Sequence, residues 1–348
     1  MRHLFWFRHD LRLHDNTGLH AACAAGEVVP CVVLDDAFLK NPAIGPNRIS
    51  LFIRAVTSLG EDIAKLGACL VVRHGRPEIE IPRLLKESRS DGVYHNRDYE
   101  PYAIARDERV AQAVRHAGGN VQSFKDLVVF EGGEVLTLAG KPYTVYTQFK
   151  NNWLRQELIP SVVPAPKRFP FPAELKSLPT EDLASFDVSP ESDVPEVTEH
   201  SGRRRLKKFL ASTVFDYATT RNQPAIDGTS QLSAHLKFGT LSPRTVVAQA
   251  RKTLESVRHP QSRTSVETFI AELIWRDFFF QILAEFPHVS SGAFRNQYDS
   301  IKWITNAAYL KAWQDGKTGY PIVDAGMRQL KATGWMHNRV RMITASFL

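Results

Sequence analysis

Residues 28–72 read VVPCVVLDDAFLKNPAIGPNRISLFIRAVTSLGEDIAKLGACLVV. The short apolar runs at its two ends, 28–34 and 68–72, have the length and continuous apolar character of buried strands. Between them, residues 47–66 carry one apolar stripe whose members recur three and four positions apart: Leu51, Ala55, Leu59, Ile63 and Leu66. Because that interval places side chains on one face of a helix, the stretch predicts a strand, a helix and a second strand in succession.

The same alternation continues on both sides of this stretch. We expect further strands at 4–7, 92–95 and 121–124, and further helices at 77–89 and 102–118. Strands that alternate with helices form a parallel sheet covered on both faces, so residues 1–130 should form a doubly wound α/β domain. The turn after the first strand, Arg8-His-Asp-Leu-Arg12, lacks the GxGxxG sequence of the simplest dinucleotide-binding domains.

The middle of the chain, residues 131–200, has no sustained period. Eight prolines, together with many serines and acidic residues, fall between residues 159 and 199. This composition is typical of an irregular linker. We therefore expect the first domain to end near residue 130 and a second domain to occupy residues 201–348.

Apolar residues in the second domain recur at helical intervals, and prolines lie at or beside the expected helix ends, where proline is tolerated. We expect an all-α domain with helices at 202–219, 243–256, 264–286, 306–314, 321–333 and 337–348. The last apolar run stops at Leu348 without a Gly or Asn cap. We therefore expect this helical domain to be incomplete.

Charge is distributed unequally along the chain. Residues 1–200 carry 23 Lys and Arg against 27 Asp and Glu, whereas residues 201–348 carry 21 against 10. The excess of positive charge in the second part favours a polyanionic partner, with nucleic acid ahead of a membrane surface.

The three cysteines, Cys23, Cys31 and Cys69, form no CxxC pair. This pattern argues against a disulfide framework and a cysteine zinc site, and it fits a reducing compartment. Charges interrupt the N-terminal apolar run, unlike in a secretory signal, and no stretch approaches 18 uncharged apolar residues. We expect a cytoplasmic protein without a membrane span or a metal site.

A hydroxyl-rich segment, residues 227–233 (DGTSQLS), precedes a helical run. Thr229, Ser230 and Ser233 could donate hydroxyl groups to a pyrophosphate there, because free N–H groups at a helix N-terminus favour anions. Ordinary helix capping would use the same residue types, so this segment alone leaves both interpretations open.

Two later segments combine side chains that bind nucleotides. Glu272, Trp275 and Arg276 share one helix face, where they could hydrogen-bond, stack on and charge-pair with a nucleotide. A structural ion pair beside a core tryptophan would explain them equally well. In residues 334–342, arginines could contact phosphates and an amide could recognise a polar ring edge, whereas we expect His337 to be structural.

Four of the six tryptophans lie in the basic half of the chain: Trp275, Trp303, Trp313 and Trp335. Aromatic faces stack on nucleic-acid bases, so this composition fits a protein that handles bases. The same tryptophans could instead fill a hydrophobic core.

Taken together, these segments resemble the photolyase/cryptochrome flavoprotein family, and the cyclobutane pyrimidine dimer photolyases most closely. The resemblance follows the family's order along the chain: Trp6-Phe-Arg-His-Asp-Leu-Arg12, Gly228-Thr-Ser-Gln-Leu-Ser233 with Leu241-Ser-Pro-Arg244, Glu272-Leu-Ile-Trp-Arg276, Gly316-Lys-Thr-Gly-Tyr-Pro-Ile-Val-Asp324 and Thr333-Gly-Trp-Met-His-Asn-Arg339. It implies an N-terminal antenna domain, a helical domain that binds FAD, and a second chromophore whose identity the sequence does not give.

The resemblance also implies an activity, that of a deoxyribodipyrimidine photo-lyase. Because we expect the helical domain to be incomplete, we expect this chain to hold FAD weakly or not at all and to be inactive for that reason. In that family, light excites reduced FAD, which passes an electron to a pyrimidine dimer flipped out of DNA, and the dimer splits. Flipping is favoured at damaged base pairs because they cost less to unstack. The implied partner is DNA containing pyrimidine dimers, and the implied oligomeric state is a monomer.

Site residues carry over from the resemblance by position. The residues expected at FAD are Tyr217, Thr229, Ser230, Gln231, Leu232, Ser233, Asn338 and Arg341. Those expected at the substrate or DNA are Glu272, Trp275, Arg276, Asn338, Arg339 and Met342. Trp303 resembles the surface member of the family's electron-transfer chain.

Two alternatives to repair remain open. Plant-type cryptochromes, which sense light without repairing DNA, usually lack the stacking tryptophan and carry Asp in place of Asn338, so Trp275, Asn338 and Met342 favour the photolyases. A non-enzymatic remnant that binds DNA through its basic half is the second alternative. Two departures from the family's pattern are Gln231 in place of an arginine and the absence of an Asn-Glu pair near Tyr99-Glu-Pro-Tyr-Ala103.

Overall fold

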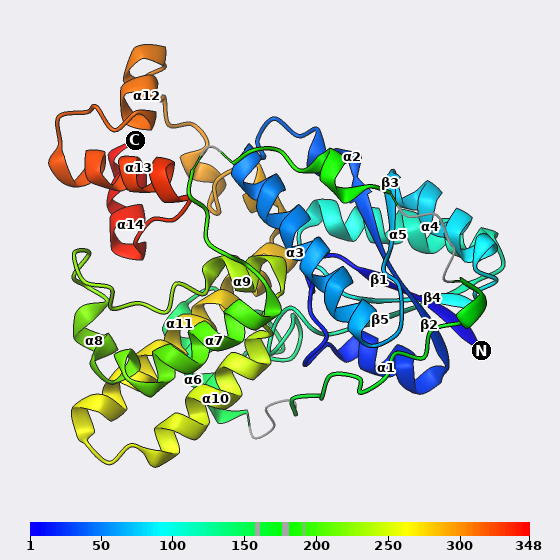
Figure 1. Ribbon diagram of the computed structural model, residues 1–348. Coiled ribbons are helices and arrows are strands. Elements are labelled where there is room, and N and C mark those ends of the chain that lie inside the picture. Colours follow the sequence, from blue (N-terminus) through cyan, green and yellow to red (C-terminus); the bar gives the residue numbers. More distant parts are fainter. Residues whose placement is uncertain (157–160, 176–180, 191) are drawn as a thin grey trace.

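The computed structural model describes residues 1–156, 161–175, 181–190 and 192–348. An α/β unit and a helical unit lie side by side (Figure 1). The linker expected over 131–200 includes residues 157–160, 176–180 and 191, which lie outside the described residues.

The α/β unit is built on a five-stranded parallel sheet with the order β3-β2-β1-β4-β5. Its strands are β1 (Arg2–Phe7), β2 (Glu27–Asp35), β3 (Val71–Gly75), β4 (Gly92–Asn96) and β5 (Asn120–Phe124). The expected doubly wound fold is therefore confirmed. The third strand begins three residues later than the apolar run at 68–72 suggests, because Ala68 and Leu70 pack into the core from the turn before it.

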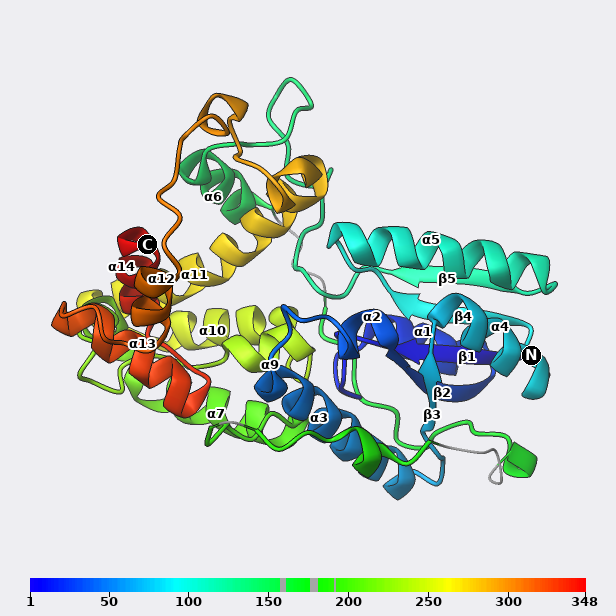
Figure 2. The same ribbon diagram turned by 90° about the horizontal axis from the view of Figure 1, so that it is seen from above.

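Successive side chains of β1 point to opposite faces of the sheet, and each face has its own core. Phe5 and Phe7 pack with α1 (Thr17–Ala25) and α3 (Pro46–Lys65), whereas Leu4 and Trp6 pack with α4 (Pro77–Glu87) and α5 (Pro101–His116). Figure 2 shows α3 and α5 on opposite sides of the sheet. A short helix, α2 (Asp36–Leu39), follows β2 directly.

The helical unit contains helices at all six places that we expect beyond residue 200; α10 and α13 have the expected ends, and the ends of the others are shifted. Its elements within the described residues are α7 (Glu199–Ala211), α8 (Tyr217–Thr220), α9 (Ser233–Phe238), α10 (Pro243–Ser256), α11 (Pro260–Glu285), α12 (Ala307–Gln314), α13 (Pro321–Thr333) and α14 (Asn338–Phe347). Short 3-10 turns join several of them, one of which, Thr213–Asp216, divides the helix expected over 202–219 into α7 and α8. No helix among the described residues has both the length and the apolar character needed to cross a membrane.

The expectation that all of 131–200 is irregular is wrong for α6 (Tyr146–Arg155). Phe149 and Trp153 lie one turn apart on this helix and are almost completely buried in the core of the helical unit. Their partners there come from α7, α10 and α11. A single ten-residue helix among prolines and polar residues carries too few apolar positions to show a period.

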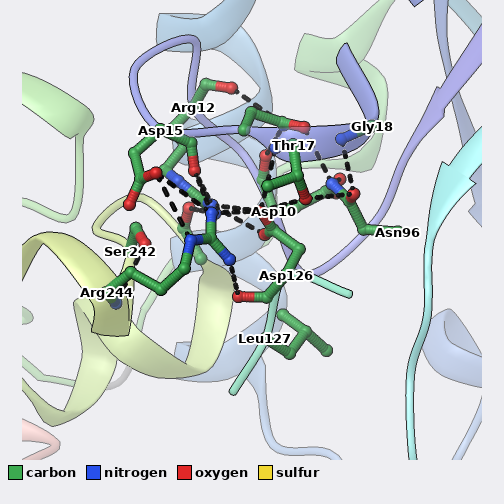
Figure 3. Close-up of polar contacts among 12 residues, drawn as sticks. Asp10, Arg12, Asp15, Thr17, Gly18, Asn96, Asp126, Leu127, Ser242 and Arg244 are labelled. Atoms are coloured by element: carbon green, nitrogen blue, oxygen red, sulfur yellow. Dashed lines mark hydrogen bonds and ion pairs between the residues drawn. The ribbon is translucent and has the colours of Figure 1, made fainter. Parts of the chain in front are cut away.

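The two units meet around a buried cluster of charged side chains (Figure 3). Arg12, which follows β1, donates to both carboxylate oxygens of Asp126 at 2.7 and 2.6 Å. Arg244 of α10 reaches across from the helical unit to Asp126 at 2.8 Å and to Asp15 at 3.2 Å. Because all four side chains are almost completely buried, each charge depends on the others for its compensation.

Protein side chains also fill the position where a doubly wound sheet usually binds ligands, the crevice between β1 and β4 where the strand order reverses. Asn96, at the end of β4, donates to Asp10 at 2.6 Å and to Asn16 at 2.8 Å. Its side-chain oxygen accepts from the backbone of Gly18 at 2.9 Å (Figure 3). These contacts bind the turn after β1 to β4.

Candidate functional site

A cavity of about 680 Å³ lies where the helical unit faces the α/β unit. Its walls come from α11, from the segment 229–237, from the start of α14, and from the ends of β1 and β4. This volume falls within the range of about 300–1,000 Å³ typical of sites for organic ligands.

Most of the expected site residues line this one cavity. They are Tyr217, Thr229, Ser230, Gln231, Leu232, Ser233, Glu272, Arg276, Asn338, Arg341 and Met342. Three expected residues, Trp275, Arg339 and Trp303, are absent from its lining. The sequence segments that we selected separately therefore meet in space, although the first and the last of them, 229–233 and 338–342, are more than 100 residues apart in the chain.

The hydroxyl-rich segment approaches the cavity as an extended turn. The helix that follows it, α9, has only six residues and is preceded by Leu232 without a side-chain cap, so ordinary capping does not account for the hydroxyls. No hydrogen bond within the described residues engages the hydroxyls of Thr229, Ser230 or Ser233, which leaves them available to a ligand. Arg205 of α7 donates to the backbone oxygen of Ser230 at 2.9 Å and supports the turn from behind.

Gln231 has the backbone conformation of a left-handed residue, with φ of 50°. Its side chain donates to Asp227 at 2.7 Å, which closes the turn on itself. A non-glycine residue in this region costs free energy, and such strain persists where the surrounding structure enforces it. The strained residue lies in the cavity wall.

The α11 helix presents Glu272 and Arg276, one turn apart, to the cavity. Glu272 pairs with Arg221 at 2.7 Å, and the guanidinium of Arg221 also lies 5.5 Å from the centre of the Tyr217 ring. Sequence analysis did not select Arg221, because no spacing rule connects a residue after α8 to a carboxylate 51 positions later. Tyr217 stays neutral, since burial raises its pKa to about 12.

Arg276 connects three parts of the protein. It donates to the backbone oxygens of Leu127 and Leu236, and its guanidinium lies 4.5 Å from the centre of the Phe280 ring. The donor pair therefore holds the segment after β5 and the helix α9 at fixed positions against α11. In this structure the guanidinium of Arg276 contacts other parts of the protein and thereby fixes the position of the cavity wall.

Two carboxylates of the α/β unit, those of Asp98 and Glu100, lie in the cavity wall. His9 Nδ1 lies 3.1 Å from Asp98, and Lys237 of α9 lies 2.5 Å from Glu100. Burial alone would raise the pKa of Asp98, but the hydrogen bond to His9 and the nearby arginines hold it well below its usual range. None of these four residues was expected at the site, because the contacts join side chains that are far apart in the sequence.

The start of α14 supplies the opposite wall. His337 caps this helix, since its Nδ1 accepts from the backbone of Arg339 at 3.2 Å, which confirms the structural role expected for it. Arg341 has no carboxylate partner among the described residues, so its charge is available to an anion in the cavity. Arg339 instead binds the side chain of Asn222 at 3.0 Å.

None of the four tryptophans in the helical domain is fully buried. Trp303 is 76% exposed, and Trp313 donates to the backbone of Thr344 at 2.9 Å. Trp275 is packed between two aromatic rings and does not reach the cavity lining. Trp275 and Trp313 are partly buried and pack against hydrophobic cores, so the core interpretation holds in part for these two and is wrong for Trp303. Trp6 and Trp153 are fully buried in cores.

Uncommitted hydroxyls, an unpaired guanidinium and apolar walls together suit a large, partly planar ligand that carries phosphate groups. An α/β domain joined to a helical domain around such a cavity defines a two-domain nucleotide-cofactor protein. The comparisons make the class specific: residues 3–170 match the DNA photolyase family, and residues 269–348 match the FAD binding domain of DNA photolyase. The chain belongs to the photolyase/cryptochrome family.

Individual relatives agree with this assignment. The deoxyribodipyrimidine photo-lyase of Halobacterium salinarum is 39% identical over 365 residues, which cover 99% of this chain and 74% of the relative. The crystal structure of a class III photolyase from Agrobacterium tumefaciens matches with a TM-score of 0.90 at 32% identity, covering 100% of this chain and 72% of that one. A Synechocystis cryptochrome matches with a TM-score of 0.89 at 26% identity, covering 100% and 74%.

Proposed function

We propose that this chain binds FAD in the cavity and acts in the light-driven splitting of cyclobutane pyrimidine dimers in DNA. The observation that carries the proposal is the convergence on one cavity of hydroxyls without partners and a guanidinium without a carboxylate. The relatives at 31–39% identity that are deoxyribodipyrimidine photo-lyases support the reaction type. The basic second half of the chain suits DNA as the partner.

The residues present fit FAD. Thr229, Ser230 and Ser233 would hold the pyrophosphate through their hydroxyls, and Arg341 would compensate its charge. Tyr217 and Leu232 supply apolar wall, and Asn338 offers an amide that can recognise a ring edge. Bound reduced FAD would supply the electron that light transfers to the dimer.

The protein's own part in the reaction is binding and orientation. Glu272 is a carboxylate acceptor for N–H groups of a flipped base, and its pairing with Arg221 orients it. Met342, which is 56% exposed, supplies an adaptable apolar contact at the opening. Phe269 and Phe280 of α11 supply aromatic rings to the cavity lining.

The first experiment measures flavin binding by the purified 348-residue chain. We expect flavin fluorescence to be quenched on titration, with stoichiometric binding at saturation. The combined substitutions Thr229→Val, Ser230→Ala and Ser233→Ala should weaken binding by about tenfold or more, because each removes a hydrogen bond to a charged group worth roughly 1.5–3 kcal/mol. Thr253→Val on α10, which is only partly buried and lies outside the cavity lining, is the control.

The second experiment tests the reaction. Ultraviolet-irradiated oligothymidylate is illuminated with blue light in the presence of the chain and reduced FAD, and dimer loss is followed by the recovery of absorbance. Loss of dimers only in the light supports the proposal. A chain that binds flavin stoichiometrically and removes no dimers contradicts the repair reaction.

A specific observation favours a second candidate, a light-sensing cryptochrome without repair. The Synechocystis cryptochrome matches this structure nearly as closely as the photolyase does, and Trp275 does not face the cavity. This candidate predicts flavin photochemistry in the second experiment without any loss of dimers.

A further inference from the structure

The solvent-exposed side of α7 is strongly basic. The four exposed cations there form what we call the basic face of α7: Arg203, Arg204, Lys207 and Lys208. At about 100° and 1.5 Å per residue, they span about 140° of the helix surface and about 7.5 Å of its axis. The apolar residues Leu206, Phe209 and Leu210 lie on the other side of α7, buried in the core of the helical unit.

The spacing of these cations works against the stability of α7. Arg203 and Lys207 are four residues apart, as are Arg204 and Lys208, and like charges at this interval repel each other on a helix. Lys207 and Lys208 have no carboxylate partner among the residues that the structure describes. The stability of the fold therefore does not account for this concentration of positive charge, which is free for a partner outside the chain.

The two arginines have carboxylate neighbours that compensate them only in part. Arg204 lies 3.2 Å from Glu196, and both side chains are more than half exposed. Arg203 lies 3.8 Å from Glu199, whose carboxylate also accepts from two backbone N–H groups after β1. Exposed ion pairs contribute little, because water and salt screen them. A partner with a denser array of negative charge can therefore displace them.

The basic face lies outside the cavity. None of its four residues belongs to the cavity lining. Arg205 is turned by about 130° from the centre of the basic face, and it donates to the backbone oxygen of Ser230 in the cavity wall. Figure 2 shows α7 at the outer edge of the helical unit. A ligand on the basic face and a ligand in the cavity therefore contact different surfaces of the protein.

A nucleic-acid duplex matches the basic face better than a membrane does. Duplex DNA carries one negative charge per about 1.7 Å of its axis, so a length of about 7.5 Å carries about four. A helix that binds a membrane surface also buries an apolar face in the lipid. The large apolar residues of α7 are buried in the protein instead, which leaves charge as the only attraction that this face offers.

Negative charge beside the first turn of α7 limits where such a duplex can lie. A second cavity, of about 650 Å³, includes His200 of α7 in its lining, together with five carboxylates and only two other cations, Arg54 and Lys65. A polyanion is repelled from this cavity. It should therefore follow the basic face toward the C-terminal end of α7, where the two lysines lie.

We propose that the basic face of α7 is a second docking surface for duplex DNA, separate from the cavity, and that it binds the phosphate backbone without regard to sequence or damage. Lysine and arginine side chains that contact phosphates release counterions, and this gain does not depend on the bases. The surface holds the chain on undamaged DNA and leaves the cavity open. The inference goes beyond the proposed function, because it needs neither flavin nor an opened base.

The test measures binding of the full chain to a fluorescein-labelled, undamaged duplex by anisotropy in the dark, at several concentrations of potassium chloride. The α7 variant replaces the four cations by glutamine: Arg203→Gln, Arg204→Gln, Lys207→Gln and Lys208→Gln. Each lost phosphate contact lowers the slope of log K against log salt concentration by about 0.9. We expect a slope that is shallower by about 2–3 and an affinity at about 0.1 M salt that is lower by about tenfold or more.

A control variant with the same change in net charge separates the basic face from the overall charge of the chain. It replaces two arginines and two lysines of the α/β unit that are exposed and lie outside the cavity lining: Arg83→Gln, Arg115→Gln, Lys40→Gln and Lys86→Gln. We expect this variant to stay within about twofold of the parent affinity, since nonspecific DNA binding follows phosphate contacts. Equal losses in the two variants, or an α7 variant within twofold of the parent, would overturn the proposal.

Two further measurements keep the outcome unambiguous. Thermal unfolding should show the α7 variant to be at least as stable as the parent, because the substitutions remove repelling pairs from a helix. Cosedimentation with phosphatidylserine vesicles that the α7 variant loses, while its DNA binding is unchanged, would assign the basic face to membranes and contradict the proposal. The DNA assay uses no light, lesion or flavin, so it can succeed when repair fails and can fail when repair succeeds.

Discussion

Asp277 is a single ionisable residue at the centre of the helical unit. Its carboxylate accepts from the backbone of Phe130 at 3.1 Å and from the indole of Trp153 at 3.0 Å, and it also accepts from Val129. Burial raises its pKa to about 6 in spite of these donors and the adjacent Arg276. The folded protein therefore binds more protons than the unfolded chain between about pH 4 and pH 6, and stability falls as the pH rises through that window.

Asp277→Asn should remove this pH dependence. The amide oxygen can take the place of the carboxylate oxygen that accepts all three hydrogen bonds, and the group no longer titrates. We expect the difference in unfolding free energy between variant and parent to shift in favour of the variant by on the order of 2–3 kcal/mol from pH 4 to pH 7. Urea unfolding at pH 4, 5, 6 and 7 measures it.

Asp277→Ala serves as the control for that measurement. It also abolishes the titration, but it leaves three buried N–H groups without an acceptor, so it should be less stable than Asp277→Asn at every pH. A parent and an Asp277→Asn variant that change in parallel between pH 4 and pH 7 would show that Asp277 does not titrate in that range.

The sequence predicts site residues that lie together in one short motif. It does not predict the partners that other elements contribute to the same site. Thr229, Ser230 and Ser233 reach the cavity together because adjacent residues move as one turn. Arg221 and His9 contact the same site from other elements, and no periodicity relates them to it. Trp275 was selected for its type and its helix face, but the ring of Tyr146 that covers it comes from a helix that the sequence did not reveal.

The end of α9 lies against the backbone of the α/β unit, and this close contact requires a glycine. Gly239 terminates the helix with φ of 68°, and a Cβ atom there would lie 1.8 Å from the backbone oxygen of His9. At this place the backbone of Leu11 donates to Phe238 at 3.2 Å. Only glycine permits so close an approach of the two backbones.

Gly239→Ala should therefore destabilise the protein well beyond the cost of its backbone conformation, by about 3 kcal/mol or more, because the junction must open to admit the methyl group. Gly319→Ala is a matched control: its φ is 85°, but a Cβ there meets nothing within 4 Å. That variant should lose only about 1–2 kcal/mol. Thermal unfolding compares them, and equal losses would show that the junction tolerates the methyl group.

Helices with a long apolar stripe were predicted correctly from the sequence. The helix expected at 47–66 is α3, and the one expected at 243–256 is α10 with the same bounds. The short helices α1 and α6 were not predicted, because two or three turns give too few apolar positions to separate a helical interval from chance. The helical run expected after residues 227–233 is α9, which has only six residues. The ends of these short helices are set by tertiary contacts, such as those of Gly239 with the α/β unit.

At the scale of the whole molecule, the buried charge cluster joins the α/β unit to the helical unit. Because both units line the cavity, the cavity depends on this contact. Burial alone would raise the pKa of Asp126, but the guanidiniums of Arg12 and Arg244 hold it below its usual range. A carboxylate with a depressed pKa contributes stability above its unfolded pKa of about 4, and that stability is lost as the pH falls through the folded value. We therefore expect acid to weaken the contact between the two units at Asp126.

Asp126→Asn tests the cluster in the intact chain. It leaves Arg12 and Arg244 buried with only part of their compensation, so it should cost about 3–5 kcal/mol at pH 7, as is typical when one partner of a buried pair is removed. The cost should shrink as the pH falls below about 4, where the carboxylate of the unfolded parent takes up a proton, until the pH reaches the depressed pKa of the folded parent. Asp62→Asn, which removes the exposed partner of Lys65, is the control and should cost at most about 1 kcal/mol. Because the cavity lies between the units, flavin titration of Asp126→Asn should show weakened binding, and unchanged affinity would mean that the helical unit alone holds the ligand.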